Sequence, residues 1–333
     1  MPILSAMASL KVTLVGMLLL SVGSMLTYGG DTGVTVWVLI VPMLLLALNL
    51  MCAIATNRKI NGQPGLLIFH LSLLALVIVI AVGRLAHLDA QVEIVIGQSF
   101  DGSHLVDLQQ GPWHAGDLNE ISFLQGPYSV SYEPGVQRGA TVSQIGLFDK
   151  NGVFEEEIVV GDDTPLIFGD YRLYTSFNKG FAVILEWLPK EGGSYTGSIN
   201  MPSFPLNDYR QKNEWTPPGS DTTVKFWLKL DTGYDEEDYW VLSKDNSSGV
   251  LVVTVDDLRV ELKEGESLQF DDGLLKYKEL TMWMGYTIFY DPTLRWLFFI
   301  SIAGVLGLGW HLWSRADQLL GKNFENKTKS GAD

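Results

Sequence analysis

Four long apolar segments constrain this chain more than any other feature of its sequence. They span residues 7–28, 34–56, 65–83 and 294–313, and each is nearly free of charged side chains. A helix rises about 1.5 Å per residue, so about 20 such residues cross the ~30 Å hydrocarbon core of a bilayer. The sequence therefore predicts an integral membrane protein with four transmembrane helices, and it excludes a soluble single-domain enzyme.

Charge is distributed unevenly along the chain. Residues 86–293 carry 34 acidic and 14 basic side chains, a net charge of −20, whereas the rest of the chain carries 4 acidic and 9 basic side chains. An acidic domain of this kind repels phosphate, so we expect no nucleic-acid partner. The single cysteine, Cys52, lies within an apolar segment, and the chain can form no internal disulfide.

The basic residues near the ends of the apolar segments predict the topology. The connection 57–61 contains Arg58 and Lys59, and the tail 314–333 contains Arg315 and three lysines, whereas the connection 29–33 contains no basic residue. The positive-inside rule therefore places both termini in the cytoplasm and residues 86–293 outside, which in a bacterium means the periplasmic side of the inner membrane. A second apolar segment follows the first closely, so we interpret the first as an uncleaved anchor and not a signal peptide.

The region 86–293 has the pattern of β-strands. Its clearest segments are short, rich in β-branched and aromatic residues and separated by turn-forming residues; they cover 92–96, 172–177, 182–187, 224–230 and 249–255. Helical periodicity is scarce there. We predict one large all-β extracytoplasmic domain, built as an antiparallel sandwich or an open barrel. Residues 323–333 are mostly polar and are predicted to be disordered.

The sequence contains no independent catalytic motif. It has no glycine-rich phosphate loop, no nucleophile elbow, no His-Glu-x-x-His and no Cys-x-x-Cys, so we name no catalytic residue. The acidic runs 155–157 and 235–238 lack the alternating ligands and central glycine of a calcium loop. We interpret both runs as solvated acidic surface.

His70 is the main candidate for a functional residue. It lies in the third apolar segment, about 8 Å from the cytoplasmic start of that segment at 1.5 Å per residue. An ionisable side chain at this depth marks a functional site by default, because it must find a polar partner. Two interpretations are open: a neutral imidazole can be an axial ligand to haem iron, or it can hydrogen-bond a neighbouring helix or a backbone carbonyl.

The other four histidines have weaker claims to a ligand role. His311 lies near the cytoplasmic end of the fourth segment between two tryptophans, where aromatic residues commonly form an interfacial belt. It should share a leaflet with His70, so a common site is one alternative. His87 is expected just outside the third segment, and His104 and His114 are expected to be solvated in a loop of the outer domain.

Three features together resemble the ResB family of cytochrome c biogenesis proteins, also called CcsB-type. Three apolar segments, a β-rich domain and a fourth segment follow in that order, with Phe-His-Leu-Ser-Leu at residues 69–73. A strand pattern at 268–273 precedes Trp-Met-Gly-Tyr-Thr-Ile-Phe-Tyr-Asp-Pro at 283–292 and the last apolar segment. Residues 168–177 are similar to the Gly-x-Tyr-x-x-Tyr strand of that family.

The resemblance implies a ResB-like subunit of a System II complex for haem delivery and cytochrome c synthesis. Such a subunit works with a ResC/CcsA-type membrane partner, acts on apocytochrome c and is in contact with membrane lipid. The family's third-segment histidine corresponds to His70, which would bind haem b transiently through the iron. The second axial ligand would come from His311 or from the partner, which carries the tryptophan-rich motif that this chain lacks.

The chain is short for this family, which allows a specialised variant that serves one cytochrome system. Because it has no independent catalytic motif, we expect a non-catalytic subunit of a holocytochrome c synthase. The alternative function is a structural or assembly subunit of a membrane redox complex that binds no haem.

Overall fold

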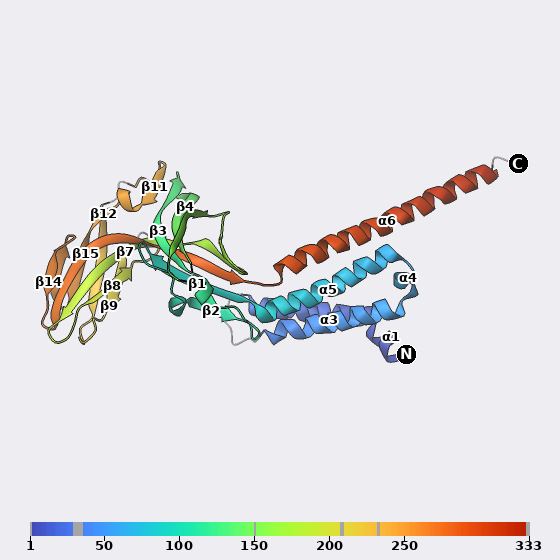
Figure 1. The fold of residues 1–333 in the computed structure, drawn as a ribbon, viewed down its shortest axis with the longest axis horizontal. Helices are drawn as coiled ribbons and strands as arrows, with labels where there is room; N and C mark the ends of the chain where they lie inside the picture. Colours follow the sequence, from blue (N-terminus) through green and yellow to red (C-terminus); the bar gives the residue numbers. More distant parts are fainter. Residues whose placement is uncertain (1, 29–35, 150, 207–209, 232–233, 331–333) are drawn as a thin grey trace. The chain divides into compact units, whose positions relative to one another are not determined.

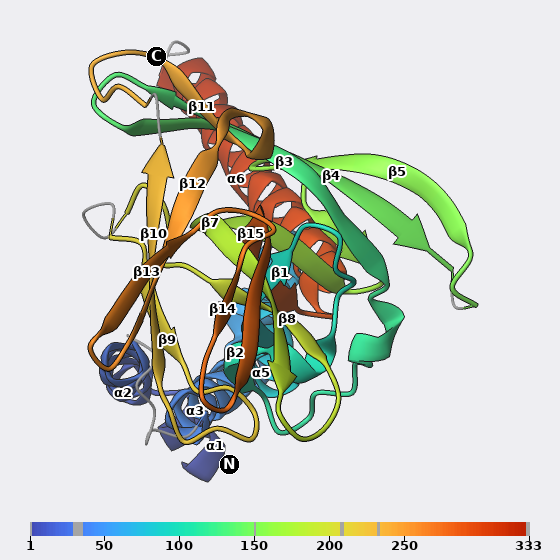
Figure 2. The same ribbon diagram turned by 90° about the vertical axis from the view of Figure 1, so that its left-hand side faces the viewer.

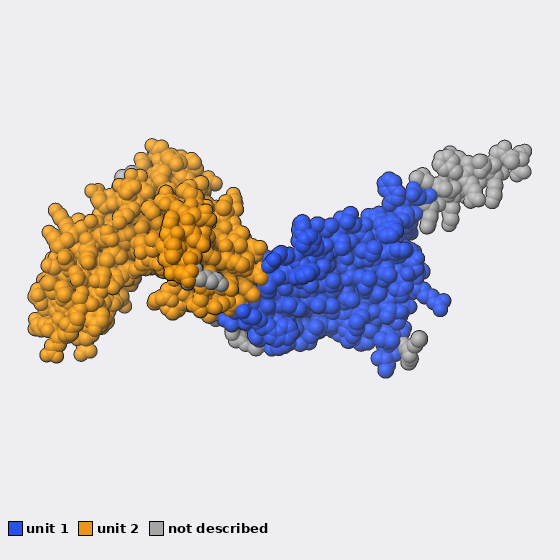
Figure 3. Space-filling model, in the orientation of Figure 1, with its two compact units in different colours: residues 1–88, 110–115, 291–333 blue, residues 89–109, 116–290 orange. Residues whose placement is uncertain are grey.

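The computed structural model describes residues 2–28, 36–149, 151–206, 210–231 and 234–330. They form two compact units, which Figure 3 colours separately. The helical unit comprises residues 1–88, 110–115 and 291–333, and the β unit comprises residues 89–109 and 116–290. Figure 1 shows the helices of the first unit and the sheets of the second.

The helical unit contains the four helices that the apolar segments predict. Its elements are α1 (Pro2–Met7), α2 (Leu10–Thr27), α3 (Trp37–Thr56), α4 (Arg58–Asn61), α5 (Pro64–Ala86) and α6 (Leu294–Ser330). Helices α2, α3 and α5 and residues 294–317 of α6 are long and apolar enough to cross a membrane. The prediction of four membrane helices is therefore confirmed.

Helix α6 is longer than the apolar segment that begins it. It continues to Ser330, so the prediction of disorder is wrong for residues 323–330, and residues 331–333 lie outside the described part of the chain. Starting a helix is costly, but extending an existing one adds a hydrogen bond for each residue that is fixed. The polar tail can therefore extend a helix that the apolar segment has already nucleated.

A buried polar residue joins the first helices. Asn49 of α3 is only 5% exposed, and its side-chain oxygen accepts a hydrogen bond of 2.8 Å from the Thr13 hydroxyl of α2. Its amide nitrogen donates to the main-chain oxygens of Met7 and Ser9, at 2.5 and 3.1 Å. All polar atoms of this side chain thus have partners inside an otherwise apolar bundle, as a polar group in hydrocarbon requires.

The β unit is built from short and long strands. They are β1 (Leu88–Val95), β2 (Val106–Gln110), β3 (Phe123–Glu133), β4 (Gln137–Phe148), β5 (Phe154–Gly161), β6 (Leu166–Phe168), β7 (Tyr171–Pro189), β8 (Tyr195–Asn200), β9 (Lys212–Trp215), β10 (Val224–Asp231), β11 (Trp240–Ser243), β12 (Ser248–Val255), β13 (Leu258–Leu262), β14 (Ser267–Gln269) and β15 (Gly273–Tyr290). Single turns of 3₁₀ helix occur at Gly102–His104, Leu118–Glu120 and Lys244–Asn246.

Three sheets make up this unit (Figure 2). The largest has the order β2-β1-β15-β7-β6, with β14 beside β15 and β8 beside β7. The other two have the orders β13-β12-β10-β9 and β11-β3-β4-β5. Long strands β7 and β15 pair antiparallel from Pro189 and Gly273 to Tyr171 and Tyr290. The predicted antiparallel β domain is confirmed, and none of its sheets closes into a barrel within the described residues.

A closed polar network joins β3 and β4 to β15 inside the core. Tyr286 donates a hydrogen bond of 2.6 Å to Gln125 Oε1, and its oxygen lies 3.0 Å from Ser143 Oγ. The Gln125 amide nitrogen donates to Ser143 Oγ at 2.9 Å, which completes the triangle. All three side chains are fully buried, and burial raises the pKa of the Tyr286 hydroxyl above its ordinary value. The network therefore fixes how two sheets of the unit pack together.

Candidate functional site in the helical unit

Helices α5 and α6 pack closely along their length through glycines. A Cβ atom at Gly65, near the start of α5, would lie 2.6 Å from the His311 nitrogen of α6. A Cβ atom at Gly83, near the end of α5, would lie 2.7 Å from the Thr293 hydroxyl just before α6. The two helices are therefore antiparallel. Small residues let membrane helices approach this closely. Such packing stabilises helix pairs in lipid, because the hydrophobic effect does not drive their association there.

Residues 110–115 cover the C-terminal end of α5. The Trp113 nitrogen donates to the Leu85 carbonyl at 2.8 Å, and the His114 ring donates to the Ala86 carbonyl at 3.1 Å. A Cβ atom at Gly111 would lie 2.2 Å from the Leu85 carbonyl oxygen, so only glycine fits there. The expectation of a solvated His114 in the outer domain is therefore wrong. This histidine is half-buried and belongs to the helical unit.

His70 has a defined protonation pattern. Its Nδ1 atom lies 2.8 Å from the Leu66 carbonyl oxygen, one helical turn earlier. A carbonyl oxygen only accepts, so Nδ1 carries the hydrogen and donates it. In the neutral ring the lone pair is therefore on Nε2. The Phe69 ring packs edge-on against the imidazole, with centroids 5.4 Å apart, and limits its rotation. The side chain is half-buried in a strongly apolar stretch of α5.

The helical repeat places His70 on the side of α5 that faces α3. Residues Val77, Ala81 and Leu85 of α5 pack with Ile40 and neighbouring residues of α3. His70 precedes Val77 and Ala81 by nearly whole numbers of turns, at about 100° per residue. It therefore lies along the same stripe of the helix, toward α3.

His311 lies on a different side of α5. Its backbone contacts Gly65 on the α6-facing side, and this side of α5 also includes the backbone of Phe69, which a Cβ atom at Gly307 would approach to 2.9 Å. His70 follows Phe69 by one residue and so points about 100° away from that side. The structure thus does not bring the two predicted ligands together on one face of α5.

A family model matches this region of the chain. The model of the ResB-like family matches residues 49–215, just over half of the sequence. The chain belongs to the ResB-like family. The matched range contains the end of α3, all of α4 and α5 with His70, and the β unit as far as β9. The resemblance of the sequence to this family is therefore confirmed.

Cytochrome c heme lyase CcmF is among the solved structures that are similar to this ResB-like protein. It shares 13% sequence identity with it, at a TM-score of 0.28. The match covers 92% of this chain and 35% of that chain, so the ResB-like protein spans about a third of the length of CcmF. No curated protein matches the sequence.

The remaining histidines of the ResB-like protein lie elsewhere. His87 follows α5 directly, and its ring Nδ1 donates a hydrogen bond of 2.8 Å to the Arg84 carbonyl oxygen. His104 is exposed in the β unit and pairs with Asp101 at 3.2 Å. In the part of the chain that the structure describes, no group of three or more His, Cys, Asp or Glu side chains could hold a metal ion.

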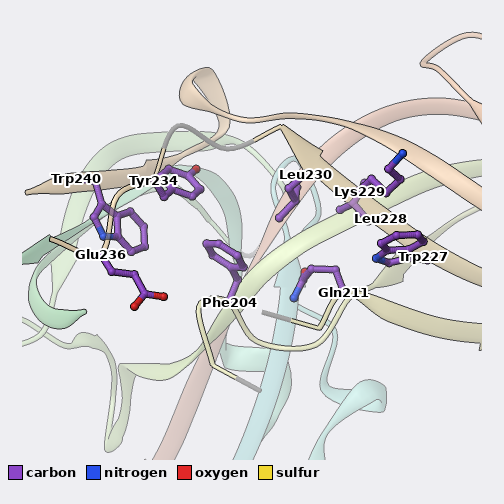
Figure 4. A pocket seen from close by; sticks show the side chains of 9 residues that line it. All are labelled: Phe204, Gln211, Trp227, Leu228, Lys229, Leu230, Tyr234, Glu236 and Trp240. Atoms are coloured by element: carbon purple, nitrogen blue, oxygen red, sulfur yellow. The ribbon is translucent and has the colours of Figure 1, made fainter. Parts of the chain in front are cut away.

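The β unit of the ResB-like protein contains an aromatic-lined cavity of about 450 Å³. Figure 4 shows Phe204, Tyr234 and Trp240 on its walls. The Trp240 ring stacks on Tyr132, with centroids 4.1 Å apart, and packs against Tyr234 at 4.5 Å. Rings thus cover this tryptophan and leave little of its surface for a ligand.

Sequence reasoning identified His70 but missed the residues that hold it. Leu66 contacts His70 only through its backbone carbonyl, and a pattern of side chains in the sequence cannot predict a backbone contact. The glycines of the α5–α6 contact were also missed. The pair Gly304 and Gly307, three residues apart on one face of α6, was the available signal, because small residues at helical spacing mark membrane helix contacts.

Proposed function

We propose that this chain is a haem-handling subunit of a cytochrome c biogenesis complex, with His70 as an axial ligand. Membership of the ResB-like family supports a role in cytochrome c biogenesis. The observation that carries the ligand role is the hydrogen bond from His70 Nδ1 to the Leu66 carbonyl. Histidines that bind metals commonly donate their other ring nitrogen to a carbonyl, which sets the tautomer and raises the basicity of the ligating nitrogen.

The surroundings of His70 suit a flat apolar cofactor. Leu73, about one helical turn after His70 and on the same side of α5, is 36% exposed, which leaves apolar surface beside the imidazole. Haem b bound here would supply an iron centre that takes an imidazole nitrogen as one axial ligand. Because His311 contacts another side of α5, we assign the second axial position to a ResC/CcsA-type partner.

The proposed topology places His70 where haem from the cytoplasm can reach it. Residues 1–85 would form three membrane helices with a cytoplasmic N-terminus, residues 86–293 a periplasmic domain, residues 294–313 the fourth span and residues 314–333 a cytoplasmic tail. Arg58 and Lys59, both on α4, support a cytoplasmic location for the turn before α5. His70 would then lie in the cytoplasmic leaflet of a bacterial inner membrane.

Cysteine labelling tests this topology in intact cells. Cys52 is replaced by alanine, and single cysteines are introduced at Asn61 and Asn246. A membrane-impermeant maleimide should label Asn246→Cys from outside and spare Asn61→Cys. Labelling of Asn61→Cys from outside would contradict the topology.

A pyridine haemochrome assay on the purified protein tests the ligand role. We expect the haem content of His70→Ala to fall about tenfold, because the chain loses its axial ligand. His104→Ala is the matched control, since His104 is exposed and its ring pairs only with neighbouring side chains. Haem at the wild-type level in His70→Ala would support the alternative of a structural subunit without bound haem.

A further inference from the structure

Strand β8 has an unprotected free edge in the β unit. It pairs with β7 on one side, and no strand among the described residues pairs with its other side. Its sequence, Tyr-Thr-Gly-Ser-Ile-Asn, contains neither charge nor proline, and all six residues are exposed or half-exposed. Natural proteins usually guard such edges with charged residues or proline, because a bare edge accepts another strand.

Two other edge strands of this unit are guarded in that way. Strand β5, at the edge of the sheet β11-β3-β4-β5, carries the three consecutive glutamates 155–157. Strand β13, at the edge of the sheet β13-β12-β10-β9, carries Arg259 and Glu261. The acidic run of β5 therefore has a physical role, since like charges repel an incoming strand. Strand β8 differs from both.

The register shows which main-chain groups of β8 point outward. Met201 donates from its nitrogen to the Phe181 carbonyl at 2.8 Å, and this pair continues the β7–β8 register. In an antiparallel pair, alternate residues bond the partner strand and those between them point away from it. Thr196, Ser198 and Asn200 are therefore the outward residues. The outward Asn200 carbonyl accepts a hydrogen bond of 2.7 Å from Asn213, which agrees with this assignment.

An open groove of about 680 Å³ lies beside the end of this edge. It is lined by Ser198 and Asn200 of β8, and its charged side chains are Glu93 of β1 and Lys212 and Glu214 of β9. The region 86–293 as a whole carries a net charge of −20. A segment that enters this groove therefore meets a predominantly negative field, which attracts cationic chains.

We propose that the free edge of β8 binds an extended, basic segment of an unfolded polypeptide by adding it as a further strand. Main-chain hydrogen bonds to Thr196 and Ser198 supply affinity that depends little on sequence, as in other cases of strand addition. The adjoining groove contains two glutamates and one lysine within a strongly acidic region, and this negative balance favours positive charge in the bound segment. The inference deepens and rests on the proposed role in cytochrome c biogenesis, for which the family resemblance implies apocytochrome c as the polypeptide that is bound.

Fluorescence anisotropy of a labelled peptide, with the full chain in detergent micelles, tests the inference. The probe is Ac-Lys-Thr-Val-Lys-Thr-Val-Lys-NH₂, and its comparison is the same peptide methylated at alternate main-chain nitrogens. We expect the methylated peptide to bind at least tenfold more weakly, because it cannot donate to a strand edge. Equal binding of the two peptides, or no binding of the unmethylated one at 1 mM, would overturn the proposal.

A proline substitution tests the same edge from the protein side. Ser198→Pro removes an outward N–H and leaves the β7–β8 hydrogen bonds in place, as proline at such edge positions does. We expect at least tenfold weaker peptide binding, with an unchanged circular dichroism spectrum, and unchanged binding for the matched control Ser198→Ala. If Ser198→Pro instead dissociates a dimer and leaves peptide binding unaltered, the edge binds a second copy of the chain, which would contradict the proposal.

The haem content of the same preparations separates this inference from the proposed function. Peptide binding that depends on Ser198, in a protein that binds no haem, would support strand addition and remove the haem role. Haem loss in His70→Ala without any peptide binding to the wild type would remove strand addition alone.

Discussion

The two units of this protein differ in where their largest apolar side chains lie, and the difference suits a different solvent for each unit. In the helical unit, Leu18 and Trp313 are 65% and 73% exposed, and these positions suit contact with lipid. In the β unit, Trp187 and Tyr286 are at most 1% exposed. The β unit can therefore use apolar burial for stability. The helical unit depends on close backbone approach and a few satisfied polar contacts.

The largest effect should come from enlarging a glycine in the helix contact. A Cβ atom at Gly307 would lie 2.9 Å from the Phe69 nitrogen and 3.0 Å from the Gly65 oxygen, so Gly307→Val forces α5 and α6 apart. We expect the free energy of unfolding, measured by titration with sodium dodecyl sulfate, to fall by about 3 kcal/mol. Gly309→Val is the control, because a Cβ atom there meets nothing within 4 Å. Equal effects of both variants would contradict close packing.

Removing one hydroxyl from the buried network should lower the free energy of unfolding by less than Gly307→Val does. Tyr286→Phe leaves Gln125 Oε1 without its 2.6 Å hydrogen bond in the core. An unpaired buried acceptor costs about 2 kcal/mol, and we expect that loss in urea unfolding followed by tryptophan fluorescence. Tyr195→Phe, at a tyrosine that is 49% exposed on β8, should change stability by less than about 0.5 kcal/mol. A similar loss in both variants would show that the network contributes nothing specific.

A buried lysine should make the stability of the β unit depend on pH. Lys179 of β7 is 1% exposed, and burial, assisted by nearby Arg138 and opposed by Asp162, lowers the pKa of its ammonium group from 10.5 to about 8. Between these values the unfolded chain binds more protons than the folded chain. The free energy of unfolding should therefore rise with pH across this window, by at most about 1.4 kcal/mol per pH unit.

Lys179→Met should abolish this contribution. The test compares urea midpoints at pH 7.5, 8.5 and 9.5, with Lys225→Met as the control because Lys225 is exposed on β10. We expect the rise to shrink in Lys179→Met and to persist in the control. An unaltered pH profile in Lys179→Met would assign the dependence to other groups.

The smallest of these effects should be the loss of the Asn49 contacts. Asn49→Leu removes three hydrogen bonds but places an apolar side chain in an apolar bundle, so we expect a loss of about 1 kcal/mol in the same detergent titration. A double-mutant cycle with Thr13→Val isolates the 2.8 Å bond between the two side chains. Full additivity of the two substitutions would show that this bond contributes no energy.

The membrane helices and many strands could be predicted because their signals are local. Apolar length marked α2, α3, α5 and the start of α6, and β-branched and aromatic residues marked strands such as β10 and β12. The contacts of residues 110–115 with the end of α5 could not be predicted. They join parts of the chain about 25 residues apart, and Gly111 differs in no local respect from an ordinary turn glycine.

The candidate site likewise has one feature that the sequence predicted and others that depend on packing. The depth of His70 in an apolar segment identified it as a candidate, but its tautomer depends on the Leu66 carbonyl and on the side-chain rotamer. That His311 lies on another side of α5 depends on the packing of α5 and α6, which the sequence of neither helix specifies alone. The free edge of β8 likewise could not be predicted from the sequence, because the order of strands is set by long-range pairing.

Chemical rescue of a His70 variant tests the central claim, that this imidazole ligates haem, most directly. His70→Gly is purified with and without 10 mM imidazole, and the haem content and Soret spectrum of each preparation are recorded. We predict that haem is lost without imidazole and largely restored with it, because a free imidazole can occupy an axial position but cannot replace a helix contact. Wild-type haem content in His70→Gly without imidazole would contradict the account.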